Sequence, residues 1–113
     1  MQRAALEERV ARLGRAVARA ASEEPSESRQ TALEGLARFS GELARHFAEA
    51  DAHAQSAARS DAQARLRSEL AEIEQRARAA GDWPESWRAV SAAFTHFARA
   101  LVEHERAEEL LTT

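Results

Sequence analysis

The chain has 113 residues, of which 44% are hydrophobic and 31% charged, and its formal net charge is −3. It contains no cysteine, which excludes disulfides, thiolate metal ligands and a cysteine nucleophile. Four glycines, two prolines and an abundance of Ala and Leu favour helix nearly throughout. We expect one domain spanning residues 1–113.

Charge and hydropathy also bear on the partners of the chain. Acidic and basic residues are interleaved, and no basic stripe is paired with exposed aromatics, so we expect no nucleic-acid partner. No apolar run approaches the roughly 20 residues needed to span a bilayer, so we expect no membrane partner. The opening MQRAALEER lacks the apolar segment of a signal peptide. The expected location is the cytoplasm.

The first predicted helix spans about residues 2–22. Its apolar residues recur at helical spacing. They are Leu6, Val10, Leu13 and Val17. Pro25 ends the helix, because a proline disfavours the helical conformation of the residue before it.

The second predicted helix begins at Ser26 or Ser28, either of which can cap it, and continues to about Ala58. Its stripe contains two histidines: Leu33, Leu36, Phe39, Leu43, His46, Ala50 and His53.

The third and fourth predicted helices are joined by a tight turn. The third spans about residues 61–80 and ends at Gly81. Asp82 is expected to cap the fourth, which begins at Trp83 and Pro84. The stripe of the fourth helix includes His104 and Glu108: Trp87, Val90, Phe94, Phe97, Leu101, His104, Glu108 and Leu111. Four long helices with short connections predict an all-α, up-down-up-down four-helix bundle.

A sequence repeat places the two stripe histidines at equivalent positions. Residues 39–51 read FSGELARHFAEAD and residues 97–109 read FARALVEHERAEE, so that His46 matches His104. The second and fourth helices of such a bundle run in the same direction, and the two histidines therefore converge on one end. We expect them to approach each other across the interior and His96, which lies off the stripe, to face solvent.

A buried imidazole or carboxylate without a partner costs several kcal/mol, roughly 2–7 for a neutral polar group. The polar residues of the stripes therefore need each other, water or a metal ion. His104 and Glu108 are four residues apart and share a helix face. With His46 they could form three ligands of a single Fe or Zn ion. His53 lies about 10 Å along the axis from His46, which makes it a candidate in a second layer.

Several segments together resemble the hemerythrin-like (HHE cation-binding) family over essentially the whole chain. They read LEERVARL, LARHFAEAD, SDAQARLRSEL, GDWPESW and LVEHERAEELL. The resemblance implies a histidine on the first and third helices, a His-x3-Glu motif on the second and fourth, and a di-iron centre for oxygen binding, iron handling or sensing. His104 with Glu108 matches the motif of the fourth helix, and His46 matches the histidine of the second.

The chain departs from that pattern at three ligand positions. Ala50 stands at the glutamate of the second helix, Arg9 at the histidine of the first, and Ala62 or Gln63 at that of the third. A full di-iron centre is therefore not expected.

Two functions follow from this ligand set, and neither is catalytic, since no nucleophilic arrangement is recognisable. The first is metal binding or redox and oxygen sensing, with His46, His104 and Glu108 as ligands. The second is a metal-free bundle acting in self-association or protein–protein interaction, as a homodimer for example. In that case we expect Arg9 to reach the bundle end and pair with Glu108.

Overall fold

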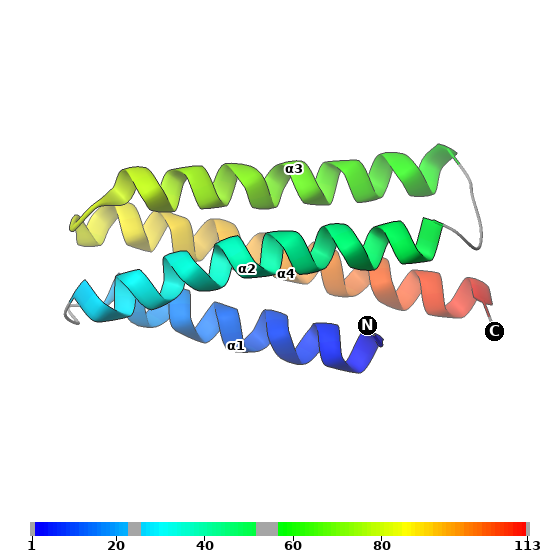
Figure 1. The fold of residues 1–113 in the computed structure, drawn as a ribbon, viewed down its shortest axis with the longest axis horizontal. Coiled ribbons are helices and arrows are strands. Elements are labelled where there is room, and N and C mark those ends of the chain that lie inside the picture. Colours follow the sequence, from blue (N-terminus) through cyan, green and yellow to red (C-terminus); the bar gives the residue numbers. More distant parts are fainter. Residues whose placement is uncertain (1, 23–25, 52–56, 113) are drawn as a thin grey trace.

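The computed structural model describes residues 2–22, 26–51 and 57–112 of the chain. Four helices form the fold: α1 (Arg3–Ala21), α2 (Ser26–Asp51), α3 (Ala57–Ala80) and α4 (Pro84–Thr112). They lie side by side along the 45 Å long axis of the molecule, and successive helices run in opposite directions (Figure 1). This arrangement confirms the predicted all-α four-helix bundle.

The packing order of the helices is cyclic. α1 and α3 each pack against both α2 and α4. α2 and α4 therefore face each other across the bundle diagonal and run in the same direction (Figure 1). Residues near their C-terminal ends lie at one end of the bundle, next to the beginning of α3.

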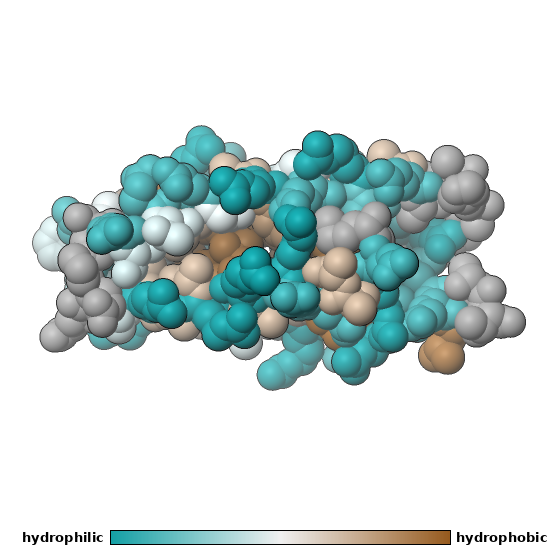
Figure 2. Space-filling model, turned by 60° about the horizontal axis from the view of Figure 1, so that its bottom comes forward, coloured by the Kyte–Doolittle hydropathy of each residue, from teal (hydrophilic) through white to brown (hydrophobic). Residues whose placement is uncertain are grey.

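A mostly aliphatic core runs the length of the bundle, with aromatic side chains contributed by α2 and α4. Trp87, Phe94 and Phe97 are fully buried. The indole Nε1–H of Trp87 donates a hydrogen bond to the carbonyl oxygen of Gly81 at 2.9 Å, which satisfies its one polar atom. Outside the core, Figure 2 shows a largely hydrophilic face, with strongly hydrophobic surface in a hollow near the middle and at a side chain that protrudes at the lower right.

The turn before α4 differs in detail from the prediction. Gly81 ends α3 with a φ of +56°, as expected of a glycine at this position. Trp83, not Asp82, is the residue before the first helical turn, because its carbonyl oxygen accepts the backbone N–H of Trp87. Asp82 instead forms an ion pair with Arg29 at 3.1 Å. The indole of Trp83 is exposed.

The connection between α2 and α3 also begins earlier than expected. α2 ends at Asp51, and Ala57 and Ala58 belong to α3 instead of the second helix. His53 lies outside the described residues.

The buried face of α2 is rotated slightly from the predicted stripe. Ala32 and Phe47 are buried, although neither was on that stripe, and Leu33 is only half-buried. None of the four described helices combines the length and apolar composition that crossing a bilayer requires.

Candidate functional site

The two stripe histidines are brought together around one aromatic ring. The ring centroid of Phe47 lies 5.8 Å from that of His46 and 5.8 Å from that of His104. The two imidazole side chains are only 12% and 13% exposed. His96 is exposed, as predicted. Both stripe histidines are thus held inside one end of the bundle.

His46 is paired with a carboxylate across the bundle diagonal. Its Nε2 lies 2.5 Å from Oε1 of Glu105 on α4. A carboxylate can only accept a hydrogen bond, so Nε2 must carry the hydrogen and donate it. Glu105 is itself buried. This contact links two helices that do not pack directly against each other.

Glu105 was not among the predicted site residues, although the sequence carried a signal for it. It follows the core residue Leu101 by four positions, as His104 and Glu108 follow core positions by similar steps. His104, Glu105 and Glu108 are therefore all placed where the buried face of α4 continues beyond Leu101. Glu105 occupies it most fully, and His104 and Glu108 flank it.

His104 is buried and weakly partnered. Its Nε2 lies 3.7 Å from Oε1 of Glu108, too far for a hydrogen bond, and has no other hydrogen-bond partner in the part of the chain that is described. Burial lowers the pKa of His104 most, and the charges of Arg59 and His46 lower it further, while Glu105 opposes the shift. The imidazole is therefore neutral at pH 7.

The charge of Glu108 is compensated by Arg59, which stands in the first turn of α3. Their side chains form an ion pair, and each is only 15% exposed. Sequence reasoning missed Arg59 because residue 59 was placed in the connection between helices. Gln63, one turn further along α3, is also buried.

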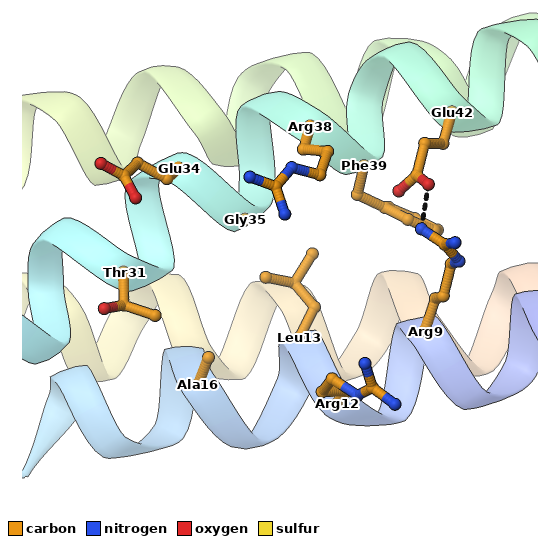
Figure 3. A pocket seen from close by; sticks show the side chains of 10 residues that line it. All are labelled: Arg9, Arg12, Leu13, Ala16, Thr31, Glu34, Gly35, Arg38, Phe39 and Glu42. Carbon is orange, nitrogen blue, oxygen red and sulfur yellow. Dashed lines mark hydrogen bonds and ion pairs between the residues drawn. The ribbon is translucent and has the colours of Figure 1, made fainter.

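The expectation that Arg9 pairs with Glu108 is wrong. The guanidinium of Arg9 contacts the carboxylate of Glu42 in a groove between α1 and α2 (Figure 3). Arg9 precedes the core residue Val10, and Glu42 precedes the core residue Leu43, so both side chains leave the core on the facing edges of their helices. Arg9 is 49% exposed, and its partner is Glu42 instead of Glu108.

These contacts do not fit a di-iron centre. The carboxylates of Glu105 and Glu108 are already engaged by His46 and Arg59. Within the described ranges, no group of three or more His, Asp or Glu side chains is arranged to hold a metal ion. Of the predicted ligands, His46, His104 and Glu108 lie in one cluster, and His53 is outside the described residues. We call the five side chains His46, Arg59, His104, Glu105 and Glu108 the polar cluster.

No family model, curated protein or solved structure matches this chain.

Proposed function

We propose that this chain is a non-catalytic, hemerythrin-like four-helix bundle in which ion pairs take the place of the metal centre. In this proposal it acts in the cytoplasm by associating with protein surfaces. The observation that supports it most is the pairing of Arg59 with Glu108 inside the polar cluster.

A guanidinium at this position opposes a metal ion in two ways. Arginine keeps its positive charge at every physiological pH and binds the same oxygens that a metal would use. A cation brought next to it would also be repelled, and such repulsion is screened less in a partly buried site than in open water. The second pair, between His46 and Glu105, removes a further potential ligand.

One observation favours the competing function, binding of a single Fe or Zn ion. His104 is neutral, and its buried Nε2 lacks a hydrogen-bond partner among the described residues. A neutral imidazole nitrogen is the form that binds metals. An ion held by His46, His104 and Glu108 would lie about 2.0–2.1 Å from each imidazole nitrogen. Glu105 now contacts the His46 nitrogen and Arg59 contacts the Glu108 carboxylate, so both would have to move away.

Calorimetric titration with Zn²⁺ separates the two functions. We expect no saturable binding to the wild-type protein at micromolar concentration, and Arg59→Ala is expected to acquire weak binding because the competing guanidinium is gone. Arg9→Ala is the matched control and is expected to behave like the wild type. Stoichiometric, tight binding of Zn²⁺ by the wild-type protein would overturn the proposal and favour the metal site.

A further inference from the structure

A groove with about 580 Å³ of free volume runs along the outside of the bundle between α1 and α4, which pack against each other. Small and apolar residues form its middle: Val10, Ala11, Gly14, Phe94, Ala98 and Val102. Charged residues stand along both rims: Glu7 and Arg15 on α1, and Arg99, Glu103 and Arg106 on α4.

Two ion pairs fix the register of α1 against α4 at one end of this groove. Arg3 pairs with Glu109 at 2.6 Å, and Glu7 pairs with Arg106 at 3.3 Å. The two helices are antiparallel (Figure 1). One turn beyond Glu7, Ala11 therefore lies level with residues 101–102 of α4. This level is within about two residues of the midpoint of the groove on each helix, and we call it the centre.

The order of the rim charges along the sequence is opposite on the two helices: acidic then basic on α1, and basic then acidic on α4. On α1, Glu7 and Arg15 lie four residues before and after Ala11. On α4, Glu103 and Arg99 lie two residues to either side of Leu101. Because the helices are antiparallel, Glu7 and Glu103 lie towards one end of the groove, where Arg106 already pairs with Glu7, and Arg15 and Arg99 lie towards the other. Arg15, Arg99 and Glu103 form no ion pair within the described residues.

We propose that this groove is the interface of an antiparallel homodimer, with a second copy of the chain as its occupant. A two-fold axis perpendicular to the helices, at the level of Ala11 and Leu101, lays α4 against α4 and α1 against α1. Glu103 then faces Arg99 of the partner subunit, and Glu7 faces Arg15 of the partner subunit. Symmetry repeats each contact.

Self-complementarity is what selects a second copy over an unrelated helix. A groove suited to an acidic or a basic helix would carry one sign of charge along its rims, whereas here Glu7 with Arg15, and Glu103 with Arg99, place opposite charges at matched distances from the centre, and Arg106 is already paired with Glu7. Small side chains in the middle, such as Ala11 and Ala98, allow close approach of the partner helices. The α4 rim from Ser91 to Arg106 is about 24 Å long. A strip of that length and two helices wide is at the lower end of specific interfaces, so we expect a micromolar dimer.

The inference rests on the association half of the proposed function, and analytical ultracentrifugation of the full chain from low micromolar to several hundred micromolar tests it. The wild type is expected to show a reversible monomer–dimer equilibrium. Arg99→Glu and Glu103→Arg should each weaken it at least about tenfold, because each places like charges opposite one another across the axis. The double variant Arg99→Glu/Glu103→Arg should restore dimerisation, since it exchanges the charges.

Arg65→Glu is the matched control, because Arg65 is exposed on α3, which does not line the groove. It should dimerise like the wild type. Far-UV circular dichroism at low concentration checks that every variant is folded. A wild type that stays monomeric, single variants that dimerise normally, or a double variant that does not recover would each overturn the dimer. A protein that is monomeric and metal-free would overturn the dimer but not the proposed metal-free bundle. A protein that retains metal, in any oligomeric state, would overturn the proposed function itself.

Discussion

The carboxylate of Glu108 lies between two candidate partners, the guanidinium of Arg59 and the imidazole of His104. A guanidinium carries its charge at every physiological pH, whereas burial lowers the pKa of the His104 imidazole and so disfavours its charged form. The charged partner takes the closer position, and His104 Nε2 remains 3.7 Å away. At the residue scale, the stability of this bundle end therefore depends on one arginine that is not part of any recognised ligand pattern.

Arg59→Ala is expected to lower the free energy of unfolding by about 2–4 kcal/mol, because it leaves a mostly buried carboxylate unpaired. Arg9→Ala is the matched comparison. Its pair with Glu42 is half-exposed on the arginine side, so the expected loss is below about 1 kcal/mol. Urea denaturation at pH 7.5 measures both. A larger loss for Arg9→Ala than for Arg59→Ala would contradict the assignment of Arg59 to Glu108.

The lowered pKa of His104 predicts a pH dependence of stability. The unfolded chain binds a proton at His104 near pH 6.5, and the folded chain does so only at lower pH. The stabilisation is thus fully present above about pH 6.5 and is lost as pH falls from there through the folded pKa. Urea midpoints at pH 7.5 and 5.5 should differ less in His104→Gln than in the wild type. His96→Gln, at an exposed position, should keep the wild-type difference; an unchanged difference in His104→Gln would argue against a neutral, buried His104.

At the scale of the helices, the apolar spacing predicted all four elements and the cores of α1 and α4 closely. The buried face of α2 was harder to predict, because His46 and Phe47 are adjacent and either could continue the line from Leu43. Phe47 takes the core position, and its ring supports both histidines. The histidine repeat thus predicted the correct end of the bundle, but it did not predict that Phe47 would lie between the two histidines.

The partner of Glu108 could not be found from spacing alone. Residues 52–56 read AHAQS and contain neither Gly nor Pro, so nothing in their composition marked the end of α2. With the third helix started too late, Arg59 had no place on it. Long side chains such as arginine also reach across a turn or more, so the pairing depends on the register between helices, which a single sequence does not define.

Two glycines inside α2 give a matched test of helix packing. A Cβ at Gly41 would meet nothing within 4 Å, whereas one at Gly35 would lie 2.8 Å from Cδ1 of Leu13. Gly41→Ala is therefore expected to stabilise the protein by about 1 kcal/mol through helix propensity. Gly35→Ala should fall short of that gain by at least about 0.5 kcal/mol, because Leu13 must move. Thermal melts compare the two, and an equal gain would show that α1 and α2 are less closely packed at this level.

At the scale of the whole molecule, the polar residues serve two different surfaces. Inside one end, arginine and histidine pair with the two buried glutamates of α4. On the outside, the α1–α4 groove carries exposed charges whose arrangement suits a second copy of the chain. In our proposal, the fold acts through association, and the polar cluster stabilises one end of the bundle instead of holding a metal ion.

Metal loading of the untagged protein tests most directly whether ion pairs take the place of a metal centre in this bundle. The protein is incubated anaerobically with excess Fe²⁺, exposed to air and desalted, after which its iron content and visible spectrum are recorded together with melts in the presence and absence of chelator. We expect no retained iron, no oxo-bridged charge-transfer bands and a melting temperature that chelator does not change. Two irons per chain with visible charge-transfer bands, or a single retained ion whose removal lowers the melting temperature, would contradict the proposal.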